Sequence, residues 1–136
     1  MWKQIDNNAS VISLYKETLP RFQNIHVQDL SVITGQVIEL DIRFDTGELP
    51  NPLPRKWEEM NVNTIQFAIG CTGVRFRHFD INDNFSDNQR LSIEVTDSTK
   101  ILTIWKSNGD IGLQVETPYV FVKSFSGYCS TLRSRD

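Results

Sequence analysis

The chain has 136 residues and a net charge of −3, with cationic and anionic side chains interspersed along it. This length predicts one domain, residues 1–136, with a single core. Nucleic-acid binders usually gather a basic excess on one face, so the composition gives no reason to expect nucleic acid as a partner. The N-terminus lacks a signal-peptide pattern and no apolar run approaches about 18 residues, so we expect a cytoplasmic protein without a membrane partner.

One N-terminal helix is predicted over about residues 8–17. Apolar side chains, among them Val11, Leu14 and Tyr15, recur there at helical spacing, and an asparagine at position 7 or 8 is suited to cap the first turn. Pro20 prevents the helix from continuing. The apolar stripe of this helix needs a surface to cover, and the apolar face of a sheet is the candidate.

Two strands are predicted next, over about residues 24–33 and 37–44, joined by a turn at Thr34-Gly35. The second strand alternates apolar and charged residues, whereas the first changes phase partway along. An extra residue near Gln28 or Asp29 restores the phase, so the pattern predicts a β-bulge there.

Residues 45–61 contain a cluster of prolines and show no sustained period, which predicts a long loop. Long connections in compact domains often carry function. Trp57, in the middle of this loop, has two interpretations. Its ring either folds back to seal an end of the core or anchors an interface with a partner.

Alternation resumes over residues 63–79 and predicts a hairpin about Thr72-Gly73, with Cys71 and His78 on its apolar face. The opposite face of this hairpin would carry Arg75, Arg77 and Phe79. Residues 80–91 begin like a calcium-binding loop, but Phe85 stands where glycine is required and Leu91 where a bidentate glutamate belongs. We therefore interpret residues 80–90 as an ordinary polar connection.

The stretch from Leu91 to Glu116 predicts a three-stranded antiparallel meander. Asn108-Gly109 favours a two-residue hairpin turn, which fixes the register of the strands on either side. The apolar face would pair Ile104 with Leu113 and Leu102 with Val115, and the polar face Thr103 with Gln114 and Trp105 with Gly112. In that register Trp105 either covers the bare backbone of Gly112 or contacts a partner.

A turn at Ser98-Thr99 would place Val95 opposite Leu102 and Ile93 opposite Ile104. A last strand is predicted over residues 119–125, and the sequence leaves its register open. Together the patterns predict a mainly β fold of the α+β class. We expect a single, strongly twisted antiparallel meander sheet of seven to eight strands over about residues 24–125, with the helix on its apolar face.

The chain carries little that indicates catalysis or metal binding. Cys71 and Cys129 are expected to be reduced thiols, and no histidine or cysteine pair has metal-ligand spacing. Cys71 with His78 is the one nucleophilic pair to consider, and the expected register keeps the two several residues apart. With no catalytic or cofactor motif recognised, we expect neither an enzyme nor a cofactor.

Residues spread over nearly the whole chain resemble the immunity protein 50 family of bacterial polymorphic-toxin systems. The resemblance rests on Trp2, Ile5, Leu19-Pro20, Phe22, Val27, Pro54, Lys56, Trp57, Asn63, Ile65, Phe67, Leu91, Ile93 and Val95. The chain departs from the family pattern at Gln23-Asn24, where a more acidic or histidine-containing step is expected. Proteins of this family are encoded beside a toxin and neutralise it by binding, so the resemblance implies a cytoplasmic, non-catalytic antitoxin whose partner is a toxin domain.

The candidate partner-binding residues are large aromatic and charged side chains on the loop and the polar sheet face: Trp57, Trp105, Arg75, Arg77, Glu39, Asp41 and Glu94. A second hypothesis makes the curved sheet a cup for a small apolar ligand, with the helix as its lid. Large side chains argue against it, because Phe44, Phe67, Phe76, Leu102 and Ile104 are expected to fill the space. A third hypothesis is an enzyme that uses Cys71 or His78.

Overall fold

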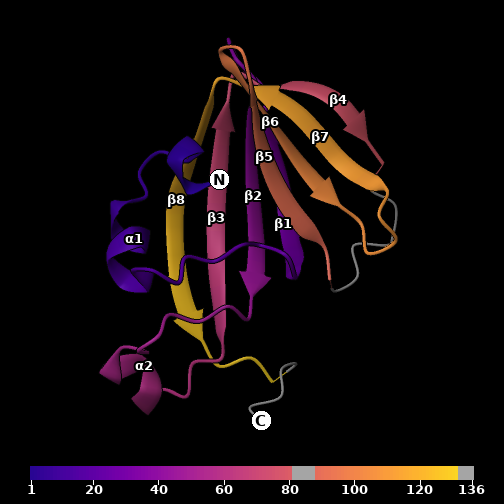
Figure 1. The fold of residues 1–136 in the computed structure, drawn as a ribbon. Coiled ribbons are helices and arrows are strands. Elements are labelled where there is room, and N and C mark those ends of the chain that lie inside the picture. Colours follow the sequence, from indigo (N-terminus) through magenta and orange to yellow (C-terminus); the bar gives the residue numbers. More distant parts are fainter. Residues whose placement is uncertain (81–87, 132–136) are drawn as a thin grey trace.

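The computed structural model describes residues 1–80 and 88–131 (Figure 1). In chain order these residues form a 3-10 turn η1 (Trp2–Gln4), helix α1 (Ala9–Tyr15), strands β1 (Ile25–Ile33) and β2 (Glu39–Thr46), helix α2 (Arg55–Glu59), and strands β3 (Thr64–Thr72), β4 (Arg75–Phe79), β5 (Arg90–Thr96), β6 (Thr99–Trp105), β7 (Ile111–Thr117) and β8 (Tyr119–Tyr128).

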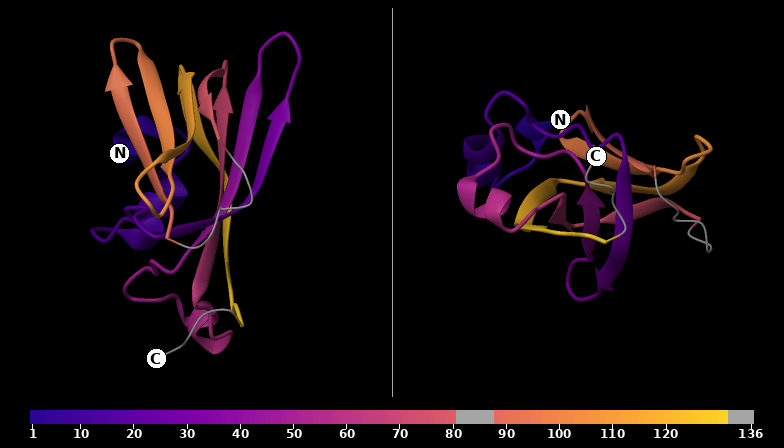
Figure 2. Two further views of the ribbon diagram at one scale, coloured as in Figure 1. Left: turned by 90° about the vertical axis from the view of Figure 1, so that its right-hand side faces the viewer. Right: turned by 90° about the horizontal axis from the view of Figure 1, so that it is seen from below.

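The strands form two antiparallel sheets of four strands each. Sheet A has the order β1-β2-β3-β8 and sheet B the order β4-β7-β6-β5. The predicted antiparallel, mainly β architecture is confirmed, but the prediction of a single sheet is wrong. Figure 2 shows that the β1–β2 hairpin of sheet A and the β5–β6 hairpin of sheet B diverge at one end of the molecule.

The predicted hairpin at Thr72-Gly73 is also wrong, because the chain bends there instead of reversing. Strand β3 pairs with β8, with Thr72 opposite Tyr119, and β4 pairs with β7 in the same register, with Arg75 opposite Glu116. Segments β3–β4 and β7–β8 therefore run side by side through both sheets and turn the corner together.

Glycine and proline occupy this corner. Gly73 adopts a φ of +74°, and a Cβ at this position would lie 3.3 Å from the ring of Pro118 on the neighbouring segment. The Thr117 hydroxyl donates a hydrogen bond to the Thr72 carbonyl oxygen at 2.8 Å and ties the two segments together. A glycine with positive φ suits a corner as well as a hairpin turn, which explains why the local pattern was misleading.

The central register of the β6–β7 hairpin is as predicted. Leu102 lies opposite Val115 and Ile104 opposite Leu113, and all four side chains are fully buried. On the other face Thr103 lies opposite Gln114, also as predicted. These pairs place the apolar residues of sheet B against the core.

The turn of this hairpin differs from the prediction. The Gly109 N–H donates to the Lys106 carbonyl oxygen at 2.9 Å, so the turn spans residues 107–109 rather than two residues. A bulge next to Ile104 compensates for the extra residue and places Trp105 opposite Ile111. The predicted pairing of Trp105 with Gly112 is therefore wrong, although the rest of the register is unaffected.

In the β5–β6 hairpin the predicted register is wrong by two residues. Ile93 lies opposite Leu102 and Val95 opposite Lys100, because the turn lies at residues 97–98. A shift of two residues keeps each side chain on its expected face, since side chains alternate with a period of two. Ile93 therefore still faces the inner side of sheet B.

Strand β4 carries a bulge that the sequence did not reveal. The register shifts between Phe76 and His78, so that His78 lies opposite Gln114 and Phe79 opposite Leu113. The predicted faces of His78 and Phe79 are thereby exchanged. Phe76 and Phe79 both lie on the inner side of this edge strand, with rings 5.9 Å apart and exposed fractions of 37% and 56%.

Several other boundaries and irregularities can be compared with the predictions. The bulge near Gln28 or Asp29 is confirmed, because the register with β2 shifts between Val27 and Asp29. The predicted long loop, residues 45–61, is interrupted by helix α2, and its first two residues belong to β2. The predicted calcium-like loop falls largely on residues 81–87, outside the described residues.

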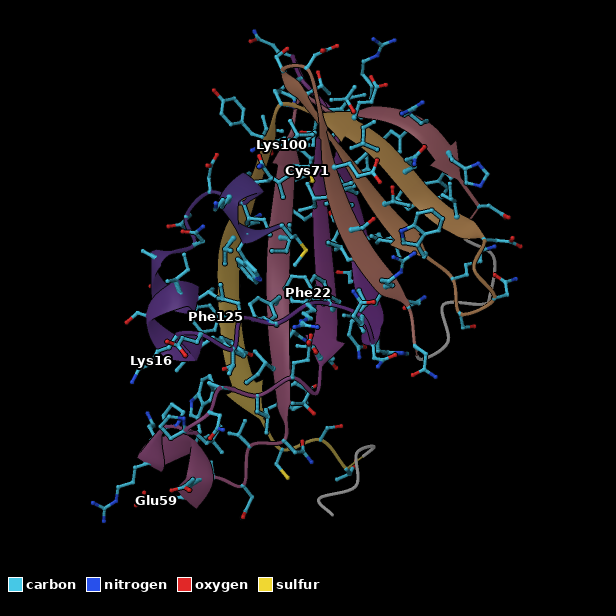
Figure 3. The ribbon with its side chains drawn as sticks, in the orientation of Figure 1. Lys16, Phe22, Glu59, Cys71, Lys100 and Phe125 are labelled. Atoms are coloured by element: carbon cyan, nitrogen blue, oxygen red, sulfur yellow. The ribbon has the colours of Figure 1, made fainter. Side chains whose placement is uncertain are left out.

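The core lies between the two sheets and extends under α1. Phe22 is fully buried at its centre, with ring centroids 4.9 Å from Phe44 and 5.2 Å from Phe67. Helix α1 packs on sheet A as predicted: Val11 and Tyr15 are fully buried, and the ring of Tyr15 lies 6.4 Å from that of Phe67. Figure 3 shows Phe22 in this interior.

Candidate partner interface

The candidate binding residues do not share one face, because the molecule has two sheets. Arg75, Arg77, Glu94 and Trp105 belong to sheet B, whereas Glu39 and Asp41 belong to β2 of sheet A. Trp57 lies in α2, outside both sheets. The structure thus separates the predicted set into two opposite outer faces and a helix at one end.

We call the outer surface of sheet B the Trp105 face. Three rows of side chains cross it, from β5 through β6 and β7 to β4, as given by the strand registers. The rows are Glu94, Ile101, Glu116 and Arg75; then Ser92, Thr103, Gln114 and His78; and last Arg90 and Trp105.

Trp105 is held in place by two side chains of β5. Its indole Nε1 donates a hydrogen bond to the Ser92 hydroxyl at 2.9 Å, and the guanidinium carbon of Arg90 lies 4.8 Å from the ring centroid. The ring is half-buried. Its contacts at this position therefore include Arg90 and Ser92 of the neighbouring strand.

Charged side chains border the other end of the Trp105 face. Arg75 and Glu94 are exposed, and the bulged Arg77 places its Nε 3.6 Å from the Glu116 carboxylate. Both partners of this ion pair retain contact with solvent, so it contributes little to stability. These charges remain accessible to a partner that approaches sheet B.

We call the outer surface of sheet A the Asp41 face. It carries a groove of about 370 Å³, whose floor includes Ala68, Ser124 and Ser126. Two ion pairs flank the groove. Lys123 Nζ lies 2.6 Å from the Asp41 carboxylate, and a guanidinium nitrogen of Arg43 lies 3.4 Å from the Asp29 carboxylate. Glu39 is half-buried at the start of β2 on this face.

A buried carboxylate adjoins this groove. Asp45 is only 5% exposed, and its two oxygens accept hydrogen bonds from Gln28 Nε2 at 2.8 Å and Gln66 Nε2 at 3.1 Å. The Tyr128 hydroxyl donates a further short hydrogen bond to the same carboxylate. Sequence reasoning missed Asp45 because it placed this residue in the long loop, where a carboxylate is expected to be solvated.

Trp57 packs against the end of sheet A. A Cβ built on Gly127 of β8 would lie 3.1 Å from two ring atoms of Trp57 and 2.8 Å from Val62. The indole thus covers a bare stretch of β8 backbone, and the side chain is half-buried against the core. This geometry favours the interpretation of Trp57 as a seal on the core.

Cys71 and His78 are brought to different sheets. Cys71 is buried on the inner side of β3, where burial, reinforced by the Asp41 carboxylate, raises the pKa of its thiol to about 12. His78 is exposed on the Trp105 face. Among the described residues, no group of three or more histidine, cysteine, aspartate or glutamate side chains is placed to hold a metal ion.

Comparison with known proteins gives one clear result. The family model described as immunity protein 50 matches residues 7–128. No curated protein and no solved structure matches the chain in these comparisons. Within the described parts of the chain, no helix is long and apolar enough to cross a membrane. Since the matched residues make up most of its length, the chain belongs to the immunity protein 50 family.

Proposed function

We propose that this chain is a non-catalytic antitoxin that binds a cognate bacterial toxin domain in the cytoplasm and thereby neutralises it. Membership of the immunity protein 50 family carries the proposal. The placement of the two side chains considered for catalysis is consistent with it, because Cys71 is buried with a raised pKa and His78 lies in the other sheet.

The Trp105 face is the proposed interface. Tryptophan and arginine are enriched among the residues that dominate binding energies at protein interfaces, and here Arg90 is stacked on a half-buried Trp105. Exposed charges of both signs, Arg75 and Glu94 among them, border this pair and provide electrostatic selectivity for a partner. We propose the following contacts: Trp105, Arg90, Arg75, Arg77 and Glu94.

The small-ligand hypothesis finds less support. Four of the five side chains expected to fill the interior, Phe44, Phe67, Leu102 and Ile104, are fully buried in the core. Helix α1 packs on sheet A with its apolar residues inside the same core, so it does not act as a separate lid.

Co-expression with the toxin encoded by the neighbouring gene tests the function. The wild-type chain is expected to restore growth, and growth no better than with the toxin alone would reject the proposal. The interface is tested with Trp105→Ala, for which we expect a loss of affinity of about 30-fold, in the range of strong interface residues. Glu39→Ala on the Asp41 face is the matched control. If Glu39→Ala weakens binding and Trp105→Ala does not, the interface lies on sheet A.

A further inference from the structure

Among the described residues, strand β5 forms one edge of sheet B, and part of this edge has no neighbouring strand. In an antiparallel pair, successive residues direct their backbone groups alternately toward and away from the neighbour. Leu91 directs its N–H away from β6, because this group donates to the Phe22 carbonyl oxygen at 3.0 Å. By the same alternation, the backbone groups of Ile93 and Val95 also point away from β6.

These outward groups have no partner within residues 1–80 and 88–131. The chain around Phe22 covers the edge only as far as Leu91, and no hydrogen bond joins the outward backbone of Ile93 or Val95 to another described segment. Unpaired strand edges accept a further strand, and most proteins protect them for this reason. Here the edge presents two consecutive pairing positions.

A groove with a mixed apolar and polar lining lies beside this edge. It has a volume of about 360 Å³; its apolar lining includes Trp2, Leu19 and Pro20, with Leu91 and Ile93 of β5, and its polar lining is Arg21, Gln23 and Ser92. Figure 2 shows the N-terminal segment next to the β5–β6 hairpin. Beyond the groove, the side chain of Val95 is 51% exposed, which is unusual for an apolar residue on an inner sheet face.

We propose that an extended segment of the toxin adds to the edge of β5 as a further strand. This proposal rests on the proposed function and specifies how the partner is held. Backbone groups of the segment would bond to those of Ile93 and Val95, and an apolar side chain of the segment would enter the groove between Trp2 and Ile93. Strand addition gives affinity through the main chain and selectivity through pockets for alternate side chains.

Glu94 indicates the charge of this segment and argues against a second copy of the same chain. If two copies paired through Ile93 and Val95, Glu94 would face Glu94 of the other copy in a closely spaced, non-hydrogen-bonded pair. Like charges directly opposite each other are destabilising. A segment with lysine or arginine opposite Glu94 would instead form a favourable cross-strand pair on the Trp105 face, where Glu94 is exposed.

The substitution Val95→Pro tests the pairing directly. Proline removes the outward N–H but leaves the hydrogen bonds to β6 intact, since those come from Glu94 and Thr96. Val95→Thr is the matched control, because it keeps both the N–H and the branched shape. With a catalytically inactivated toxin domain as the probe, we expect Val95→Pro to raise the Kd about tenfold, as for one lost hydrogen bond, and Val95→Thr to leave it nearly unchanged.

Amide hydrogen exchange on the wild-type chain provides a readout that does not depend on the folding of a variant. The amides of Ile93 and Val95 are expected to become protected when the toxin domain is added, whereas those of Ser92 and Glu94 are protected in both states by β6. Tight binding without protection of Ile93 and Val95 would overturn strand addition and leave the antitoxin function standing. A wild-type chain that does not bind at all would reject both, and a dimer abolished by Val95→Pro would identify a second copy as the occupant.

Discussion

The carboxylate of Glu48 accepts a hydrogen bond from the backbone N–H of Phe22 at 2.9 Å, and its other oxygen accepts one from the N–H of Arg21 at 2.9 Å. Phe22 adopts a φ of +54°, which is uncommon for a residue with a side chain. Its ring nevertheless lies at the centre of the core. Glu48, from the connection after β2, thus fixes the backbone that inserts Phe22 between the sheets.

Removing this carboxylate is expected to destabilise the fold. Glu48→Ala leaves two backbone N–H groups without their acceptor and releases the strained conformation at Phe22. We expect the free energy of unfolding to fall by about 2 kcal/mol, since hydrogen bonds to charged groups contribute about 1.5–3 kcal/mol each and water replaces part of the loss. Urea denaturation measures the change.

Glu48→Gln is the matched control for this prediction. The amide keeps one acceptor oxygen and the same length, so its loss of stability should be smaller than that of Glu48→Ala. Equal stability of Glu48→Ala and the wild-type chain would show that the bonds to Arg21 and Phe22 do not hold the core in place.

The sequence predicted those parts of the fold that depend on local alternation. The pairs Leu102–Val115 and Ile104–Leu113 follow from a nearby turn signal, and they stay correct because a bulge at Trp105 compensates for the longer turn. The β5–β6 register was wrong by two residues, yet the faces were right. Patterns with a period of two therefore predict which side of a sheet is buried more securely than they predict partners.

The division into two sheets could not be read from the same signals. A glycine such as Gly73 followed by a strand is compatible with a hairpin turn or with a corner between two sheets. Only the segment around Pro118, which is distant in sequence and lies beside Gly73, distinguishes the corner from the hairpin. The candidate interface is affected in the same way. Trp105 and Asp41 point outward both in the predicted single sheet and in the observed structure. Because they belong to different sheets, however, they lie on opposite sides of the molecule.

The corner at Gly73 yields a second stability prediction. Gly73→Ala introduces a Cβ at a φ of +74° and only 3.3 Å from the Pro118 ring. We expect it to lower the free energy of unfolding by about 2 kcal/mol, of which roughly 1 kcal/mol is the backbone strain of a left-handed residue.

Gly109→Ala separates the two contributions. Gly109 has a φ of +92°, but a Cβ there would meet no atom within 4 Å, so only the backbone strain applies. Thermal or urea unfolding should show a larger loss for Gly73→Ala than for Gly109→Ala. The opposite order would indicate that the contact with Pro118 relaxes freely.

The buried thiol of Cys71 predicts how stability depends on pH. Its pKa is raised from 9.0 to about 12 in the folded chain, so the unfolded chain releases this proton first as the pH rises. Between about pH 9 and 12 the folded state binds one more proton than the unfolded state, and the free energy of unfolding falls by about 1.4 kcal/mol per pH unit from this group. Below pH 9 the contribution is fully retained.

Tyr15 also lowers the free energy of unfolding at alkaline pH, because burial and, to a smaller extent, the Glu48 carboxylate raise the pKa of its hydroxyl. Cys71→Val isolates the cysteine contribution: stability measured at several alkaline pH values should decline less steeply than in the wild-type chain. Cys129→Ser controls for the loss of a thiol. Identical slopes for Cys71→Val and the wild-type chain would contradict the raised pKa of Cys71.

Trp57 provides the last prediction, which separates its two interpretations. Because its ring covers the Gly127 backbone at the end of sheet A, we expect Trp57→Ala to reduce the free energy of unfolding by about 2 kcal/mol, less than for a fully buried tryptophan. Trp57→Phe should lose less, since a ring remains over the backbone. Gly127→Ala should in turn cost less in the Trp57→Ala background, because the added methyl group then meets no indole. A seal on the core also predicts that folded Trp57→Ala binds the toxin domain with the wild-type Kd. A large loss of affinity with no loss of stability would make Trp57 an interface anchor instead.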